Sequence, residues 1–595
     1  MTVNEKIRAI REKLVQHELS AYIIPSTDPH MGEYVPDHWA ERTWISGFTG
    51  SAGTVVITKD FSGLWTDSRY FLQAEDQLSG TEMELLRLEI PHTAEHIDWI
   101  KAHLPEGSRI AVNGNMIPVS SVRDMKSRLS KNKMELITHI DLVKKVWTNR
   151  PALPDDLLMD HPVAFSGRSR KDKISDTREY MTKAGATHYL VSALDEIAWV
   201  LNLRGKDITF NPLFVSFVLI SHEDSILYID EKKLPVSLKQ EIYADGISIR
   251  SYSDIIGDLS RLSDSTILAI DPGRTNQAMM NAVHSQVKIH EELSFITRLK
   301  AIKNEVEING LRDVMIKDGA AWVKFLCWLD KNIGKITISE LSAAEKLVSF
   351  RLEQKDYIGP SFHPISSYSN HGSVVHYAVS KESSIELHAE GIYLCDTGGH
   401  YLDGTTDTTR TITLGNPSEQ QKQDFTLALK GTLGVSMLRF PKGTKGYQMD
   451  ILARKALWDY GLNFGHGTGH GVGFFLNVHE GPQTIGTGAS GNMNTSFEPG
   501  MITTVEPAIY REGSYGMRTE NMTLCTEDLV NEFGVFYKFE TLTLAPVDLE
   551  LIEVSLLTQV EIKWLNDYHQ IVREKLSGLL SEEERLWLKS KTRKL

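Results

Sequence analysis

Four acidic side chains and one histidine follow one another through the last third of this 595-residue sequence. Carboxylate oxygens are the ligands that Mg²⁺, Ca²⁺ and Mn²⁺ prefer, and a single imidazole moves the preference toward Mn²⁺, Co²⁺ or Zn²⁺. Four carboxylates with one neutral imidazole also balance the charge of two divalent cations. We therefore predict a site for two divalent metal ions, Mn²⁺ first, with Co²⁺ or Zn²⁺ as alternatives. The predicted ligands are Asp396, Asp407, His470, Glu506 and Glu520.

The first two acidic residues flank a turn that contains several glycines. Asp396 ends the apolar run of residues 391–395, and Asp407 lies in a threonine-rich run, residues 405–414. Two strands joined by such a turn make a hairpin. We expect a register that places Asp396 opposite Asp407, with Cβ atoms ~4.5–5.5 Å apart. At that distance one carboxylate would keep its proton, unless metal ions relieved the repulsion.

A second hairpin is expected to carry the other two acidic residues. We predict strands at residues 501–506 and 516–525, joined by a turn at residues 511–515. This hairpin would let Glu506 face Glu520. Two metal ions held ~3.5–4 Å apart by such ligands would supply an activated water molecule and polarise a carbonyl group.

Two further features lie within reach of these ligands. Arg518 shares a strand face with Glu520, because strand side chains alternate with period two. Arg518 would either balance the nearby carboxylates or contact a substrate, and the sequence leaves both roles open. His466 and His470 also share a face of an extended segment, GHGTGHGVG at residues 465–473, whose glycines permit close approach of other groups.

Composition narrows the class of protein. Hydrophobic residues make up 41% of the chain, and the net charge of −14 argues against nucleic acid or an anionic membrane as the main partner. Residues 1–25 lack the apolar core and cleavage site of a signal peptide, and no run of ~18 apolar residues could span a membrane. The three cysteines fit the reducing cytosol rather than a disulfide framework, so we expect a cytoplasmic protein.

The N-terminal half has the pattern of two related α/β domains, because strands alternate with helices in both. The segment YII at residues 22–24 recurs as YLV at residues 189–191, and WTD at residues 65–67 recurs as YID at residues 228–230. The second domain is therefore predicted to be a diverged copy of the first. The predicted domains are residues 1–148, 149–303 and 304–595, the last ending in a helical extension.

Several helices are expected along the chain. The first domain should begin with a helix at residues 3–17 and contain another near residues 34–42. In the second domain, Asp195 and Glu196 fit a helix N-terminus, where acidic side chains are favoured. A long helix should open the third domain within residues 300–307.

The ligands, in their order and sequence context, resemble those of the pita-bread metallopeptidases, which include methionine aminopeptidase, prolidase and aminopeptidase P. The whole chain resembles the long, three-domain form of aminopeptidase P. The resemblance implies an α/β (α+β) fold with two creatinase/prolidase N-terminal-like α/β domains followed by a C-terminal pita-bread domain. It also implies a homodimer that removes the first residue from peptides with proline at position two. The motifs that carry it are YLCDTGG (393–399), DGTTD (403–407), GHGTGHGVG (465–473), TVEP (504–507) and MRTEN (517–521).

The same resemblance assigns a role to each metal ligand. Asp407 and Glu520 would bridge both ions. Asp396 would complete the coordination of one ion, and His470 with Glu506 that of the other.

Three histidines match substrate-contacting positions of the family. His376, in a His-Tyr pair, would donate a hydrogen bond to the substrate carbonyl or oxyanion. His479, in NVHEGP at residues 477–482, would bind substrate and handle protons, and His466 would contact the proline side. Glu506 would relay a proton to the leaving proline nitrogen.

Two alternatives to an aminopeptidase P stay open. Prolidase shares the five ligands and cleaves X-Pro dipeptides, but its chains usually have one N-terminal domain. A peptidase-like binding module without catalysis would be expected to have lost ligands, whereas all five are present here. Creatinase shares the fold and lacks the metal ligands.

Overall fold

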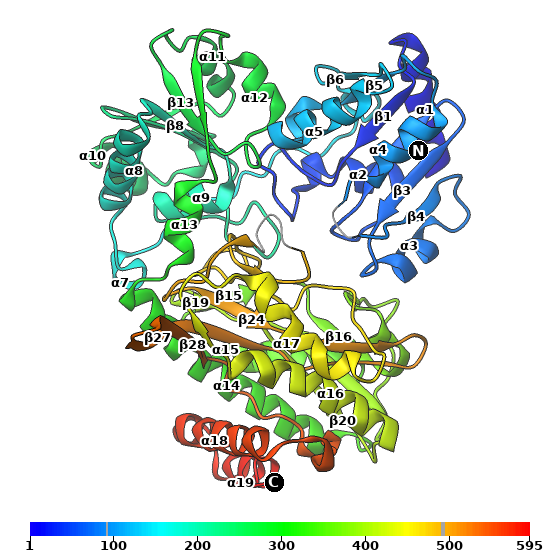
Figure 1. Cartoon of the computed structure of the whole chain (residues 1–595), viewed down its shortest axis with the longest axis vertical. Coiled ribbons are helices and arrows are strands. Elements are labelled where there is room, and N and C mark those ends of the chain that lie inside the picture. Colours follow the sequence, from blue (N-terminus) through cyan, green and yellow to red (C-terminus); the bar gives the residue numbers. More distant parts are fainter. Residues whose placement is uncertain (91–92, 489–493) are drawn as a thin grey trace. The chain divides into compact units, whose positions relative to one another are not determined.

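The computed structural model shows a chain that forms two compact units (Figure 1). The first contains Met1–His161 and Arg168–Thr297, and the second contains Pro162–Gly167 and Arg298–Leu595. All the metal-ligand candidates therefore belong to the second unit. Within the part of the chain that is described, no helix combines the length and apolar character needed to cross a lipid bilayer. The described residues are 1–90, 93–488 and 494–595.

The first unit contains two six-stranded sheets of the same topology. In spatial order the strands of one sheet are β4 (Glu84–Arg87), β3 (Ser62–Thr66), β2 (Thr54–Thr58), β1 (Ala21–Ile24), β5 (Arg109–Val112) and β6 (Glu135–Ile137), and those of the other are β12 (Ile247–Arg250), β11 (Ser225–Tyr228), β10 (Phe217–Ser221), β8 (His188–Val191), β13 (Ile267–Ile270) and β14 (Lys288–Glu291). Strand β1 is antiparallel to β2 and parallel to β5, and β8 is likewise antiparallel to β10 and parallel to β13. The repeated residues 22–24 and 189–191 fall on the matching strands β1 and β8. This correspondence supports the proposed duplication.

Helix α1 (Val3–Gln16) shows how local sequence sets an element. It begins with a capping box, in which Thr2 and Glu5 satisfy each other's backbone N–H groups. Its buried apolar residues recur every three or four positions, so one face packs into the core of the first sheet. The helix expected at residues 3–17 is confirmed.

The helix expected near residues 34–42 is wrong. The chain instead forms a 3₁₀ turn, η1 (Asp37–Trp39), and then α2 (Glu41–Ser46). Pro36 has no backbone N–H and a fixed φ, so a helical turn can begin after it but cannot continue through it. Ala40, with a ψ of 50°, separates the two elements.

Helix α9 (Leu194–Val200) holds Asp195 and Glu196 in its first turn, as expected. The other helices of the first unit are α3 (Phe71–Leu78), α4 (Glu95–His103), α5 (Val119–Ser130), α6 (Leu142–Val146), α8 (Arg170–Ala184), α10 (Val236–Ala244), α11 (Asp254–Ser260) and α12 (Gln277–Ala282), and a short pair of strands is β7 (Met159–Asp160) with β9 (Leu203–Arg204).

The second unit is built from small antiparallel sheets, and the site lies where their strands end. The sheets, in spatial order, are β15 (Tyr357–Pro360), β18 (Gly399–Tyr401) and β19 (Gly404–Thr405); β16 (Ile365–Tyr368), β17 (Ile392–Thr397) and β20 (Thr408–Thr413); β21 (Arg439–Pro441), β28 (Gly534–Thr541), β27 (Asn521–Asn531) and β24 (Ile502–Val505); β22 (Gly469–His470) and β23 (Thr484–Ile485); and β25 (Ala508–Arg511) and β26 (Tyr515–Arg518).

Helices pack against these sheets. The long helix expected to open within residues 300–307 is confirmed as α14 (Glu305–Asn332), and a separate short helix, α13 (Phe295–Ala301), precedes it. Asn304 and Glu307 form the capping box that starts α14. The remaining helices of the second unit are α7 (Val163–Ser166), α15 (Glu340–Leu352), α16 (Glu419–Ser436), α17 (Gly446–Trp458), α18 (Gln559–Leu576) and α19 (Glu582–Lys591).

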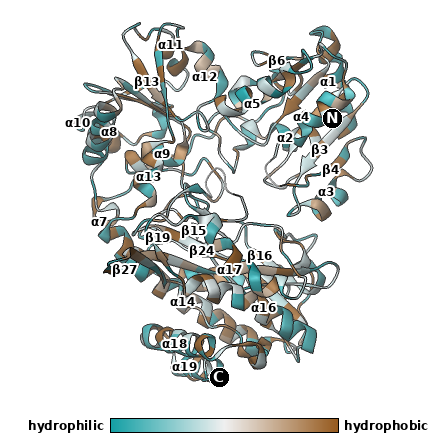
Figure 2. Cartoon of the chain, in the orientation of Figure 1, coloured by the Kyte–Doolittle hydropathy of each residue, from teal (hydrophilic) through white to brown (hydrophobic). Residues whose placement is uncertain are grey.

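The C-terminal helices α18 and α19 are amphipathic (Figure 2). In α18 the buried residues Leu565, Tyr568, Val572 and Leu576 recur every three or four positions. They join a hydrophobic core that also includes residues of α14 and α16. The extension is thus packed into the second unit as part of its core.

A buried ion pair joins two helices to the end of β17. Arg351 of α15 binds Asp318 of α14 through two contacts, Nε to Oδ1 at 2.7 Å and Nη2 to Oδ2 at 3.1 Å. The same guanidinium donates to the carbonyl oxygens of Thr397 and Gly398. Because both partners are buried, removing one would leave the other charge uncompensated.

We predict that Arg351→Met lowers the free energy of unfolding by about 3–5 kcal/mol, because it strands the Asp318 carboxylate in the core. Urea denaturation followed by circular dichroism measures the change. Lys324→Met is the matched control, since the exposed Lys324–Glu353 pair joins the same two helices and should contribute under about 1 kcal/mol. Equal effects of the two substitutions would contradict the prediction.

Candidate metal centre

The first two acidic residues lie beside one another on neighbouring strands, but not in the expected register. Asp396, near the end of β17, pairs with Thr409, and Asp407 lies just before β20. The predicted opposition of Asp396 and Asp407 is therefore wrong. The reason is a separate hairpin, β18 and β19, inserted between the strands. Gly398 allows this departure, because a Cβ there would collide with the Thr406 carbonyl oxygen.

Glu506 and Glu520 lie at the end of the ladder between β24 and β27. Strand β24 pairs with β27, and the ladder's last pair is Val505 with Asn521. Continuing this register by one residue places Glu506 opposite Glu520, as the sequence predicted. The strand expected at residues 516–525 is interrupted, however, since β26 ends at Arg518 and β27 begins at Asn521.

His470 is held by one hydrogen bond from its backbone and one from its imidazole ring. Its backbone N–H donates to Thr504 Oγ1 at 3.1 Å, and its Nδ1 lies 3.0 Å from the Gly471 carbonyl oxygen. The carbonyl contact requires a proton on Nδ1, which leaves Nε2 as the metal-binding atom. Nε2 lies 3.4 Å from Asp407 Oδ2 and 3.6 Å from Glu506 Oε1.

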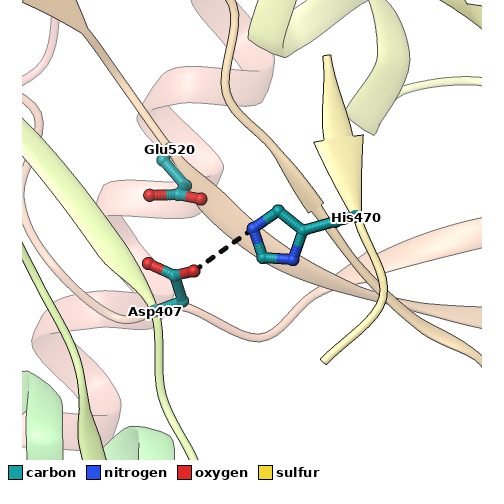
Figure 3. Close-up of side chains that lie close together, drawn as sticks. All are labelled: Asp407, His470 and Glu520. Atoms are coloured by element: carbon teal, nitrogen blue, oxygen red, sulfur yellow. Dashed lines mark ion pairs between the residues drawn. The ribbon is translucent and has the colours of Figure 1, made fainter. Parts of the chain in front are cut away.

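The side chains of Asp407, His470 and Glu520 converge (Figure 3). One ligand atom from each lies within 4.8 Å of the other two. Asp396 Oδ1 is buried and, among the described residues, has no hydrogen-bond partner. A buried, unpaired carboxylate oxygen beside further carboxylates is the environment that a divalent cation would complete.

Burial and mutual repulsion raise the pKa of three carboxyls. Burial is the larger cause for Asp396, Glu506 and Glu520, and the neighbouring carboxylates add to it. The pKa of Glu506 rises to about 7. For His470, burial lowers the pKa, but the Asp407 and Glu506 carboxylates outweigh it and raise the pKa to about 9. The donor set therefore fits divalent cations, which would replace these protons.

Arg518 sits at the centre of a hydrogen-bonded chain that the sequence did not reveal in full. Its Nη2 binds Asp396 Oδ2 at 2.5 Å, its Nε donates to Thr409 Oγ1 at 3.1 Å, and its Nη1 donates to the Tyr510 hydroxyl at 2.5 Å. Tyr510 in turn lies 2.9 Å from His466 Nε2. The ion pair with Asp396 is what a charge-balancing Arg518 requires, while a substrate contact stays a prediction.

Two residues that hydrogen-bond with Arg518 were not predicted from the sequence. Thr409 lies two positions after Asp407, so strand alternation could have placed both on one face. Its hydroxyl donates to Glu520 Oε2 at 2.7 Å. Tyr510 gave no comparable signal, because only the hairpin of β25 and β26 brings its hydroxyl to Arg518.

The remaining predicted histidines occupy different positions relative to the cluster. The ring of His479 meets that of His470 edge to face, with 4.4 Å between centroids. His376 is half-buried in the turn that follows η4 (Ser369–Ser373), a segment that packs against β17 and β26. The structure thus brings His479 and His466 to the ligand residues, and His376 follows a segment that packs against β17, the strand of Asp396.

Comparisons with known proteins place this arrangement in a family. The model of the creatinase/prolidase N-terminal domain matches residues 6–146, and a second model with that description matches residues 149–307. The model of metallopeptidase family M24 matches residues 309–527, and that of the C-terminal region of peptidase M24 matches residues 535–595.

Full-length relatives give the same result. The chain is 38% identical to a probable Xaa-Pro aminopeptidase P of Talaromyces marneffei, over 100% of this chain and 92% of the relative. It is 37% identical to one from Paracoccidioides brasiliensis, over 99% of this chain and 98% of the relative. The crystal structure of X-prolyl aminopeptidase from Caenorhabditis elegans, described as a cytosolic enzyme with a di-nuclear active site, superposes over 100% of both chains with a TM-score of 0.95 and 32% identity.

Fold and donor set together define a metallo-exopeptidase with creatinase-like N-terminal domains and an M24 pita-bread domain. Within that class, the chain belongs to the Xaa-Pro aminopeptidase P family.

The pKa shifts predict how metal stabilises the protein at different pH. The raised pKa values of Glu506 and His470 mean that the metal-free folded protein holds protons that the unfolded chain releases, so its stability falls as pH rises from ~5 to ~9. Metal binding needs the deprotonated ligands and strengthens over the same range. Added Mn²⁺ should therefore raise Tm by more at about pH 8 than at about pH 6.

Differential scanning calorimetry of chelator-treated protein, with and without Mn²⁺, measures these increments. Asp407→Ala is the control and should show little increment at either pH. Equal increments in the parent protein at both pH values would refute the prediction.

Arg518→Lys should weaken Mn²⁺ binding by about tenfold, because a lysine keeps the charge beside Asp396 but cannot also hold Thr409 and Tyr510. Isothermal titration with Mn²⁺ and steady-state kinetics test this. Arg511→Lys is the control and should leave Mn²⁺ affinity unchanged. Arg511 lies in the same hairpin as Arg518, but its two hydrogen bonds go to Asp424. An effect of Arg518→Lys on KM alone would assign Arg518 to the substrate instead.

Proposed function

We propose that this protein hydrolyses the peptide bond between the first residue and a proline at position two, and so releases the first residue of the peptide. The observation that carries the proposal is the convergence of Asp407, His470 and Glu520 in a chain that aligns end to end with Xaa-Pro aminopeptidases. Retention of the whole predicted ligand set argues against a non-catalytic binding module.

The proposed metal site holds two divalent ions, with Mn²⁺ first and Co²⁺ or Zn²⁺ as alternatives. Asp396, Asp407, His470, Glu506 and Glu520 would hold these ions. When bound, the ions would supply Lewis acidity that activates water and polarises the substrate carbonyl.

The chain's own residues would then orient the substrate and move its protons. Asp396 would lie nearest the free amino group of the first residue and so fix the exopeptidase register. His376 would donate a hydrogen bond to the oxygen of the scissile carbonyl as negative charge develops on it. Glu506 would accept a proton and deliver one to the proline nitrogen.

Recognition of proline would depend on what its nitrogen lacks. A proline nitrogen carries no N–H, so a site that selects it cannot rely on that donor. His466 and His479, with Arg518, would form the polar edge of a pocket around the rigid ring. The T-shaped contact of His479 with His470 supports its place beside the metal centre.

The wider setting is proposed on the same grounds. We infer a homodimer acting in the cytoplasm on peptides with proline at position two; the Caenorhabditis elegans relative is described as cytosolic. The domains are proposed at residues 1–148, 149–303 and 304–595, with the first two as copies of one ancestral fold.

Product analysis on two substrates tests the activity. Chelator-stripped protein with Mn²⁺ restored should release the first residue from an X-Pro-Pro tripeptide, and Asp407→Ala should lose this activity at least about a hundredfold, because an orienting ligand is gone. Asp403→Ala is the matched control, since Asp403 lies in the nearby turn between β18 and β19 and pairs with Lys317. Cleavage of an X-Pro dipeptide alone would make the protein a prolidase, and cleavage of neither substrate would reject a peptidase.

A further inference from the structure

The chain breaks its strand pairing at Glu520, and this leaves backbone groups to be satisfied in another way. Thr519 and Glu520 lie between β26 and β27, outside both strands. Both residues are buried, so their carbonyl oxygens need donors from within the protein. The Thr519 carbonyl oxygen accepts from Thr432 Oγ1 at 2.9 Å.

The Glu520 carbonyl oxygen accepts from Arg410. Arg410 Nη1 donates to the Glu520 carbonyl at 2.7 Å and to the Thr409 carbonyl at 2.8 Å. The Glu520 N–H closes the contact by donating to the same Thr409 carbonyl at 3.2 Å. One guanidinium nitrogen therefore joins β20 to the backbone of Glu520, where no ladder does so.

Arg410 is in turn held by the C-terminal part of the chain. Its Nε donates to the Pro546 carbonyl oxygen at 3.1 Å, and its Nη2 donates to the Ala545 carbonyl oxygen and to the Tyr568 hydroxyl, each at 2.9 Å. Tyr568 lies on α18 and is 4% exposed, so this contact is shielded from bulk solvent. Its hydroxyl also lies 3.0 Å from the Thr543 carbonyl oxygen, which can accept the phenolic proton.

We propose that α18 helps to position a ligand of the metal centre. Tyr568 is a positioning residue: its hydroxyl orients Arg410, and Arg410 fixes the backbone of Glu520 so that its carboxylate meets Asp407 and His470. The inference rests on the proposed role of Glu520 as a metal ligand. It gives the C-terminal extension a function in metal binding that its packing alone does not require.

The size of the effect follows from the geometry. Tyr568→Phe keeps the aromatic ring and its packing but removes one acceptor of Arg410 Nη2, which keeps the Ala545 carbonyl oxygen and Asn521 Oδ1. The guanidinium then has fewer buried contacts that fix its plane, and the Glu520 carboxylate loses precision. Loss of a residue that orients a ligand typically weakens metal affinity ~10–100-fold, and we expect about tenfold for Tyr568→Phe, which acts through Arg410.

The test measures Mn²⁺ affinity by isothermal titration in the full chain, not only activity. Tyr568→Phe should bind Mn²⁺ about tenfold more weakly than the parent. Glu561→Gln, which disrupts the ion pair of α18 with Lys430, is the matched control on the same helix and should bind Mn²⁺ like the parent. If Tyr568→Phe binds Mn²⁺ like the parent while Glu520→Gln binds it more weakly, the inference is overturned and the proposed ligand set stands.

Two further results complete the test. Parent-like affinity of Glu520→Gln would overturn the proposed ligand set and the inference together. Amide hydrogen exchange, measured on metal-free protein below its unfolding temperature, distinguishes a local effect of the substitution from a general loss of stability. Tyr568→Phe should speed exchange at residues 519–522 more than in α14, and a uniform increase along the chain would reject the positioning role.

Discussion

Buried negative charge is the constraint around which the second unit is arranged. Asp396, Glu506 and Glu520 are removed from water and lie near one another, which raises the pKa of each. Without cations such a cluster is unfavourable, because buried like charges gain neither hydration nor pairing. The same arrangement becomes a ligand set when divalent ions are present. The fold therefore has to hold these carboxylates in place against their own repulsion.

The fold does this by placing the ligands where strand ladders stop. Glu506 and Glu520 lie just beyond the Val505–Asn521 pair, and Asp407 lies just before β20. At such points the backbone needs partners from outside the ladder, and the Glu506 N–H finds one in the Thr468 carbonyl oxygen at 2.7 Å. A small residue is also needed: a Cβ on Gly469 would strike the Thr504 carbonyl. This steric limit accounts for the glycine directly before His470.

The metal-ligand residues could be predicted from the sequence, but the residues that hold them in position could not. Ligand chemistry is a property of residue type, so the acidic residues and His470 could be read directly. The register of Asp396 could not, because it depends on the hairpin at residues 399–405, whose short strands leave only a weak pattern in the sequence. Arg410 and Tyr568 are 158 residues apart in sequence. Nothing in the periodicity of either segment indicates that they meet, since only tertiary packing joins them.

The charge count of the assembled site differs from the one that the ligands alone give. Four carboxylates balance two divalent ions, but the buried guanidinium of Arg518, paired with Asp396, adds a positive charge to the same volume. An arginine stays charged there, because its pKa is raised further by Tyr510 and the carboxylates, which outweigh burial. Counting these side chains and ions, and a water molecule that still holds both protons, the loaded site would carry about one excess positive charge. Peptide hydrolysis develops negative charge on the carbonyl oxygen, and a fixed positive surplus in a region shielded from water lowers the energy of that state more than that of the neutral peptide. Arg518 would then contribute to the rate through the charge of the whole site, even without touching the substrate.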